Sequence, residues 1–140
     1  MTDLTLAHAQ VIVEHALAAG RAAGLQPLTV AVLDSGGHLK AFAREDTSAI
    51  LRPQIAIGKA WSALGLGRGT RSLSEKSPSF LASLAAMSEG KVVPSPGGVL
   101  VRDASGAVIG AVGITGDTGD NDEACAVAGI EAAGLTADGG

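Results

Sequence analysis

Apolar positions at helical spacing dominate the first part of the chain. Residues 5–17 (TLAHAQVIVEHAL) are rich in alanine, and their larger apolar side chains recur three and four residues apart. This spacing predicts one long amphipathic helix. We expect Thr2 or Thr5 to cap its start. Gly20 or Gly24 should mark its end, since glycine readily takes the left-handed conformation that follows a helix.

The same periodicity returns after an interval of about 35 residues. Residues 52–64 predict a helix that begins near Arg52, because Pro53 is tolerated in a first helical turn. Gly58 lies in the interior of this helix, where glycine is unfavourable. It therefore indicates that another part of the chain packs against the helix backbone.

A glycine-rich stretch, residues 65–69, ends this helix and lacks the lysine of a phosphate-binding loop. We expect Thr70 to cap the next helix. Residues 72–90 predict a helix with one apolar face. The residues of that face are Phe80, Leu81, Leu84 and Met87.

Shorter apolar runs bounded by turn residues predict four strands in two hairpins. The first hairpin joins residues 28–33 to 39–44 through a glycine-containing turn. The second joins residues 99–102 to 108–115 through a four-residue turn. We expect the strand at 108–115 to be the last of an antiparallel sheet, and residues 136–140 to form a frayed tail.

An acidic segment, residues 117–123 (DTGDNDE), precedes an alanine-rich helical stretch. Asp120 and Glu123 resemble a capping box, in which Asp120 accepts from an early helix N–H and Glu123 reaches back. One cap does not require four carboxylates. The surplus could bind a metal, orient a substrate or keep the loop solvated, and the sequence leaves these alternatives open.

Composition and charge narrow the class of protein. The 140 residues are enough for one domain, residues 1–140, with a sizeable core. The net charge of −4 argues against nucleic acid or an anionic membrane as the main partner. Because no segment resembles a leader or a membrane span, we expect a cytoplasmic protein. The single Cys125 excludes a disulfide within the chain, and we expect a packed thiol.

A few residues could carry chemistry. Lys59 lies in an apolar helical run, so its ammonium either reaches past the core to water or contacts an anionic ligand. Residues 94–98 (PSPGG) predict a rigid pocket wall, and we expect the acidic segment to face this wall and Lys59. His8 and His15 are two turns apart, and each is either an ordinary surface histidine or a ligand of metal or haem. No cysteine pair or His-Glu-x-x-His motif supports a zinc site.

Four groups of short motifs occur in a fixed order along the chain. They read VAVLDSGG at 30–37, RED at 44–46, KAWSA at 59–63, and GGV at 97–99 with IGAVGITG at 109–116 and DE at 122–123. Over roughly residues 4–135, this order and spacing resemble the GlcG/HbpS family of haem-binding-like proteins. That family includes the C-terminal domain of PduO-type adenosyltransferases.

The resemblance implies an α+β fold with a profilin-like layout, in which helices flank a central antiparallel sheet of about five strands. It also implies dimers or larger oligomers, and haem or corrinoid binding, haem degradation, redox sensing or catabolic roles. For a haem axial ligand, the resemblance makes His15 the nearest candidate and His8 the second. Arg52 departs from the family pattern and adds a guanidinium suited to a carboxylate.

Three functional readings stay open. In the first, a cytoplasmic oligomer binds haem, another tetrapyrrole or another small anionic or oxygenated ligand through Arg44, Asp46, Arg52, Lys59, Gly97 and Gly98. In the second, a cofactor-independent isomerase, lyase or hydrolase acts on a small oxygenated catabolic metabolite. Its acid–base groups would be Asp122 or Glu123, with His38 as an alternate, and Lys59 or Arg52 would orient a carboxylate. The third is a structural or partner-binding subunit.

Overall fold

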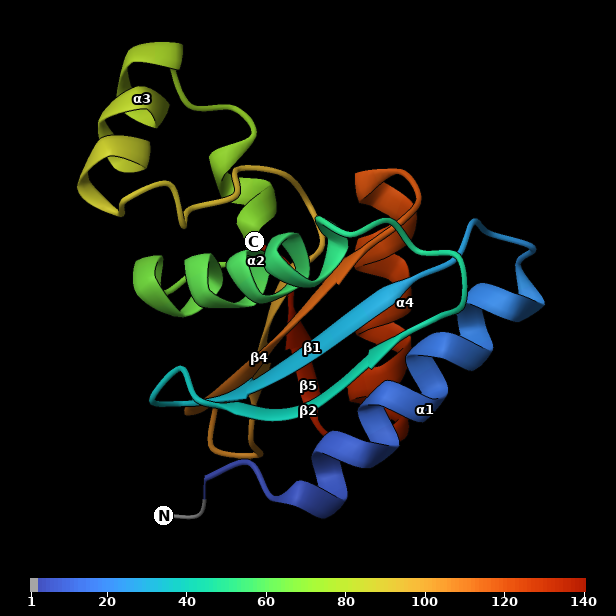
Figure 1. The fold of residues 1–140 in the computed structure, drawn as a ribbon. Coiled ribbons are helices and arrows are strands. Elements are labelled where there is room, and N and C mark those ends of the chain that lie inside the picture. Colours follow the sequence, from blue (N-terminus) through green and yellow to red (C-terminus); the bar gives the residue numbers. More distant parts are fainter. Residues whose placement is uncertain (1–2) are drawn as a thin grey trace.

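The structure, a computed structural model, describes residues 3–140. Four α-helices, one short 3-10 helix and five strands follow one another along this part of the chain (Figure 1). In order they are α1 (Leu6–Ala22), β1 (Thr29–Asp34), β2 (Leu39–Arg44), α2 (Arg52–Leu66), η1 (Thr70–Leu73), α3 (Pro78–Met87), β3 (Gly98–Arg102), β4 (Val108–Thr115), α4 (Gly119–Ala132) and β5 (Thr136–Asp138). None of the helices within residues 3–140 is long and apolar enough to cross a membrane.

The strands form one antiparallel sheet in the order β2-β1-β4-β3-β5, which gives the α+β fold that we expected. Helices α1 and α4 pack together on one face, and α2 crosses the other face (Figure 1). Successive side chains of β1 point to opposite faces of the sheet. Val30 and Val32 therefore join the core under α1 and α4, whereas Leu33 packs with α2. The sheet therefore separates two apolar layers.

Small residues let α2 lie directly on the sheet. A Cβ added at Gly113 of β4 would collide with the carbonyl oxygen of Ala56 in α2. Gly58 is covered on its outer side, where an added Cβ would lie 2.7 Å from Val93 Cγ2 and 2.9 Å from the Lys91 carbonyl oxygen. The expectation that another segment packs against Gly58 is confirmed.

The predicted hairpins and the starts of two helices are also confirmed. Thr5 caps α1 by accepting a hydrogen bond from the His8 N–H at 3.1 Å, and Gly24 follows the helix with a φ of +68°. Helix α2 begins at Arg52. The alternative cap, Thr2, lies outside the described residues. Cys125 is a buried free thiol, as expected.

Two expectations about the sheet are wrong. β4 is not the last strand, because β5 follows α4 in the chain, and within the sheet β4 lies between β1 and β3. Residues Thr136–Asp138 form the edge strand β5 instead of a frayed tail, because they pair with β3 and Arg102 binds Asp138 at 2.9 Å.

The expected helix caps at Asp120 and Thr70 are wrong as well. Helix α4 begins at Gly119, two residues earlier than a cap at Asp120 would place it, and Thr118 caps it by accepting from the Asn121 N–H at 3.2 Å. Thr70 is the first residue of η1, and its hydroxyl accepts from the Gly98 N–H at 2.8 Å.

The third predicted helix is shorter than its apolar pattern suggested. It covers Pro78–Met87 rather than residues 72–90, and Ser77 caps it. Of its expected apolar face, Leu84 is buried, whereas Phe80 and Met87 are exposed. The pattern therefore predicted the helix but not its surroundings.

Candidate functional site

Lys59 and Asp122 form a buried ion pair at the end of β4. The Lys59 Nζ lies 3.2 Å from Asp122 Oδ2 and donates to the Ile114 carbonyl oxygen at 2.8 Å. The second carboxylate oxygen of Asp122 accepts from the Asp117 N–H at 3.0 Å. Lys59 is 3% exposed and Asp122 is 1% exposed. The sequence expectation that the acidic segment faces Lys59 agrees with this geometry.

Two adjacent glycines close the site around Lys59. Gly97 has a φ of +125°, and a Cβ there would lie 2.7 Å from Lys59 Nζ. A Cβ at Gly98 would collide with the Lys59 carbonyl oxygen. Pro96 completes this wall against α4, since a Cβ at Gly119 would lie 3.1 Å from Pro96 Cδ. The wall predicted at residues 94–98 thus packs against Lys59 in α2 and against the start of α4, the helix that carries Asp122.

Burial shifts the protonation equilibria of both partners. It lowers the pKa of the Lys59 amine and raises the pKa of the Asp122 carboxyl, because each charged form loses hydration. The attraction between the two groups opposes both shifts. The positive charge of Arg52 lowers the pKa of Lys59 further. A pair with these properties can hold one proton between an amine and a carboxylate.

Arg52 lies beside this pair on the α2 face of the sheet. Its Nη1 donates to Thr115 Oγ1 at 2.7 Å, and Thr115 follows Ile114, the residue whose carbonyl binds Lys59. The first turn and the middle of α2 therefore reach adjacent residues of β4. The role of Thr115 was not predicted, because a threonine in a strand carries no signal of a side-chain partner.

Glu123 belongs to a different cluster. Its carboxylate accepts from Arg71 Nε at 3.1 Å, and Arg71 Nη2 also binds Asp120. Since successive helical residues point about 100° apart, Glu123 faces η1 while Asp122 faces Lys59. The structure therefore separates the two carboxylates that the sequence offered as alternatives.

The histidines lie far from Lys59. His38 is in the turn at the opposite end of β1, with its side chain 82% exposed and its Nδ1 3.3 Å from Asp34 Oδ1. His8 and His15 are on α1, across the sheet from α2. His15 is exposed, and His8 is half-buried with no hydrogen-bond partner for Nδ1 among the described residues.

Arg44 and Asp46 line a separate, shallow depression of about 390 Å³ near the end of β2. Arg44 Nη1 donates to the Ser48 carbonyl oxygen at 2.6 Å. The six ligand-binding candidates therefore divide into Arg52, Lys59, Gly97 and Gly98 around the buried pair, and Arg44 and Asp46 beside β2. Within residues 3–140, no group of three or more His, Cys, Asp or Glu side chains is placed to hold a metal ion.

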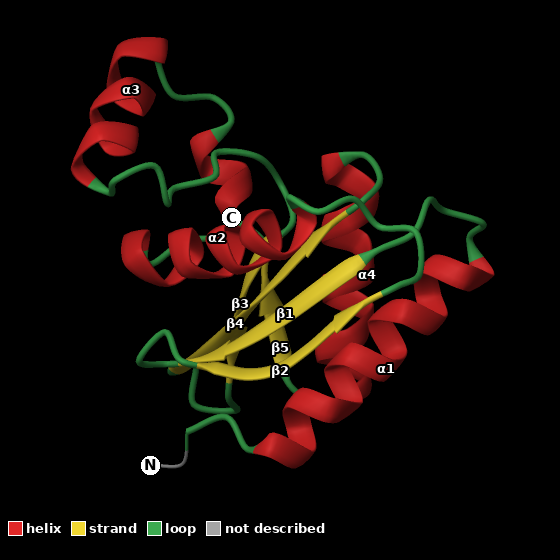
Figure 2. Ribbon diagram, viewed as in Figure 1, coloured by secondary structure: helices red, strands yellow, loops and turns green. Residues whose placement is uncertain are grey.

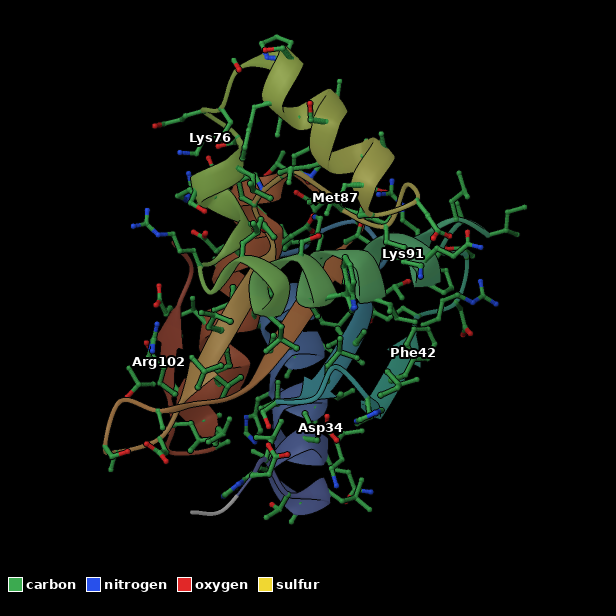
Figure 3. The ribbon with its side chains drawn as sticks, turned by 90° about the vertical axis from the view of Figure 1, so that its left-hand side faces the viewer. Asp34, Phe42, Lys76, Met87, Lys91 and Arg102 are labelled. Atoms are coloured by element: carbon green, nitrogen blue, oxygen red, sulfur yellow. The ribbon has the colours of Figure 1, made fainter. Side chains whose placement is uncertain are left out.

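A cavity with a volume of about 670 Å³ adjoins the outer side of α2. The segment Gly90–Val93 forms its opposite wall, and Lys91 is the one charged residue in its lining. Figure 3 shows Lys91 and Met87 at the α3 end of the molecule, and Asp34 and Arg102 at the other end. The lining is otherwise mostly apolar and includes Leu51, Ile55, Ile57, Trp61 and Val93. The only sequence signal for this cavity was Gly58, which indicated close packing but not an open space.

Comparison with known proteins places this geometry in a family. A family model described as "Haem degrading protein HbpS-like" matches residues 4–131. No curated protein sequence matches the chain significantly.

Solved structures share the fold across almost the whole chain. The crystal structure of a PduOC:heme complex has a TM-score of 0.87 at 24% identity, covering 96% of this chain and 97% of that one. The Klebsiella pneumoniae protein ORFY has a TM-score of 0.86 at 25% identity, covering 96% and 93%. A double mutant of Streptomyces reticuli HbpS has a TM-score of 0.79 at 27% identity, covering 94% and 87%. The protein therefore belongs to the HbpS-like family.

Proposed function

We propose that this protein binds haem or another tetrapyrrole in the apolar cavity beside α2. The observation that carries the proposal is the cavity itself. Its volume of about 670 Å³ falls within the range of roughly 300–1,000 Å³ that is usual for small-molecule sites. Its apolar walls suit the faces of a large flat ring. Lys91 supplies a cation for a carboxylate of the ligand.

The comparisons support the chemical class of the ligand. The matching family is described by haem degradation, and PduOC, which shares the fold, was crystallised with haem. Trp61 adds an aromatic ring to a chain that has only two other aromatic residues, both phenylalanine. The scarce aromatic surface thus includes one residue at the proposed site, where it can stack against a ring.

In this proposal the residues around Lys59 support the site rather than contact the ligand. The Lys59 ammonium is enclosed by Gly97 and Asp122, so it fixes α2 on the sheet while the opposite side of α2 lines the cavity. The candidate axial ligands His15 and His8 lie across the sheet from this cavity. A haem in the cavity is therefore held by apolar contacts and Lys91, and a haem on His15 would occupy a second, surface site.

Haem titration followed by the Soret band tests the proposal. We expect stoichiometric binding that Lys91→Glu weakens by about tenfold, equivalent to roughly 1.4 kcal/mol. Lys76→Glu is the matched control, since Lys76 is exposed and lies outside the cavity lining. Absence of a Soret shift at stoichiometric haem would overturn the proposal. Binding lost in His15→Ala but unchanged in Lys91→Glu would move the site to α1.

The buried ion pair favours a second candidate function, a cofactor-independent enzyme that acts on a small oxygenated metabolite. Perturbed lysine and carboxyl pKa values are common where protons are transferred. Here Lys59 and Asp122 both have shifted pKa values, and Lys59 Nζ lies 3.2 Å from Asp122 Oδ2. The Arg52 guanidinium beside them could bind a carboxylate. Turnover of oxygenated metabolites by wild type, Asp122→Asn and Arg52→Met tests it. Arg52→Met leaves the buried pair intact, so an activity that persists in both variants would reject this assignment.

A further inference from the structure

The turn between β1 and β2 holds the imidazole of His38 in one orientation. Its Nδ1 lies 3.3 Å from Asp34 Oδ1, and the same carboxylate oxygen accepts from the backbone N–H groups of Gly36 and His38 at 3.0 Å. A Cβ added at Gly36 would lie 2.9 Å from His38 Nδ1, so glycine at this position leaves room for the ring. The turn therefore positions the imidazole even though the side chain is mostly exposed.

The contact with Asp34 also selects the tautomer of His38. An ionised carboxylate only accepts hydrogen bonds, so Nδ1 carries the proton of the neutral ring. Nε2 then keeps its lone pair, and no described residue hydrogen-bonds to it. Histidines that bind metals in proteins almost always donate their other ring N–H to a carboxylate, a carbonyl or water. His38 is thus arranged as a metal ligand through Nε2, and histidine is a common axial ligand of haem iron.

This turn packs against the wall of the cavity beside α2. A Cβ added at Gly37, the residue before His38, would lie 3.7 Å from Cδ1 of Trp61. Trp61 lines the cavity and also a smaller hollow of about 230 Å³ between α2 and α3. Figure 2 shows the turn beside the C-terminal half of α2, with α1 on the other face of the sheet. A flat ring that stacks on Trp61 therefore lies next to the turn that carries His38.

The other two histidines of the chain lack this position. His8 and His15 belong to α1, which lies across the sheet from the cavity. His38 is consequently the one histidine that can serve a ligand bound beside α2. Its Asp34 partner is 16% exposed, so the residue that orients the ring is itself held in the structure.

We propose that His38 supplies, through Nε2, an axial ligand to the iron of a haem bound in the cavity beside α2, and that Asp34 positions it. This inference rests on the proposed function. The iron that accepts the lone pair of Nε2 belongs to the haem. Asp34 keeps the ring oriented and, by accepting from Nδ1–H, makes Nε2 more basic. The site then uses a histidine of the first hairpin rather than one of the first helix, and it distinguishes haem from a porphyrin without metal.

Binding of haem and of metal-free protoporphyrin IX separates the contribution of His38 from that of the cavity. Both porphyrins can be followed by quenching of Trp61, the only tryptophan of the chain. We expect His38→Ala to weaken haem binding by at least about tenfold, the smallest loss usual for residues that support a metal, and to leave the affinity for the metal-free ring unchanged. Lys91→Glu should weaken both. His15→Ala is the matched control, since it removes another exposed histidine, and it should change neither.

Absorption and Raman spectra of the haem-loaded protein identify the ligand. The wild type and His15→Ala should share the ferrous spectrum of imidazole-bound haem, His38→Ala should lose it, and added imidazole should restore it. In Asp34→Asn the hydrogen bond from Nδ1 is weaker, so the iron–nitrogen stretching frequency should fall and the reduction potential should rise. Weaker binding of haem by Asp34→Asn without these two shifts would overturn the positioning role, because loss of the turn alone would explain it.

The outcomes distinguish this inference from the proposed function. If the wild type binds neither porphyrin, both fail together. If the wild type binds haem and His38→Ala keeps the imidazole spectrum, the assignment of His38 is overturned while the proposed function stands. Loss of the imidazole spectrum in His15→Ala would overturn the assignment as well. Circular dichroism confirms that each variant folds.

Discussion

The ammonium of Lys59 and the carboxylate of Asp122 connect the two helical layers around the end of β4. Lys59 belongs to α2, on one face of the sheet, and Asp122 to the first turn of α4, on the other. Their 3.2 Å contact is shielded from water on all sides. Each charge therefore depends on the other for its compensation, and the two layers are coupled through it.

Removing one member of this pair should cost more stability than removing both. Lys59→Met leaves the Asp122 carboxylate buried without its counter-ion, and we expect a loss of about 3–5 kcal/mol in the free energy of unfolding. The double variant Lys59→Met/Asp122→Leu should recover part of this loss, because no charge is then stranded. Urea denaturation of both single variants and the double variant measures the difference. Strictly additive losses would show that the two charges do not interact.

Gly97 should tolerate a side chain much less well than Gly90. Both have positive φ, +125° for Gly97 and +78° for Gly90, but nothing lies within 4 Å of a Cβ added at Gly90. At Gly97 the added Cβ would press on Lys59 Nζ. We expect Gly97→Ala to lower the unfolding free energy by about 3 kcal/mol and Gly90→Ala by about 1 kcal/mol.

Thermal and urea unfolding of these two glycine variants provides the comparison. Similar losses at the two positions would mean that the wall formed by residues 94–98 yields to the added methyl group. In that case the enclosure of Lys59 would depend on its ion pair alone.

Thr118 rather than Asp120 should stabilise the start of α4. The Thr118 hydroxyl accepts from the Asn121 N–H, so Thr118→Ala should cost about 1 kcal/mol. Asp120 is largely exposed and pairs with Arg71, so Asp120→Ala should cost at most about 0.5 kcal/mol. Urea denaturation of the two variants checks this order. The reverse order would restore the capping role that the sequence pattern suggested for Asp120.

The sequence predicted elements well where local periodicity determines them. The hairpins and the starts of α1 and α2 followed from alternation, glycine and proline. Strand β5 could not be predicted, because its three residues form a strand only by pairing with β3 and by the contact between Asp138 and Arg102, 36 residues apart. The exposure of α3 was equally hidden, since an apolar helical stripe does not show what covers it.

The candidate site could be predicted only in part, because some of its contacts join residues that are far apart in the sequence. Asp122 and Lys59 were expected to lie together, and they do. The sequence did not distinguish the role of Glu123 from that of Asp122, because the partner of Glu123, Arg71, lies 52 residues away and only the fold brings the two together. The expected and observed caps of α4 are two residues apart, and both Thr118 and Asp120 can cap a helix. Helix periodicity does not resolve a boundary that closely.

Asp117 should make the protein sensitive to acid. Its carboxylate accepts hydrogen bonds from the Asn121 side chain at 2.7 Å, and from the Gln26 and Thr118 N–H groups. These bonds hold its pKa below the ordinary value, and the Asn121 bond is the largest contribution. A lowered pKa in the folded state means that the charged carboxylate stabilises the fold at pH values above the ordinary aspartate pKa of about 3.9. This contribution is lost as the pH falls through the folded-state pKa.

The melting temperature of Asp117→Asn should therefore lie below that of the wild type at neutral pH, and the difference should shrink once the pH falls below about 3.9. Thermal melts of both proteins from neutral to strongly acidic pH measure it. Ser105→Ala is a useful control, because it removes a donor to Asp103, another aspartate with a lowered pKa, in a distant turn. A difference for Asp117→Asn that stays constant with pH would show that Asp117 acts through hydrogen-bond geometry that asparagine cannot reproduce, rather than through its charge.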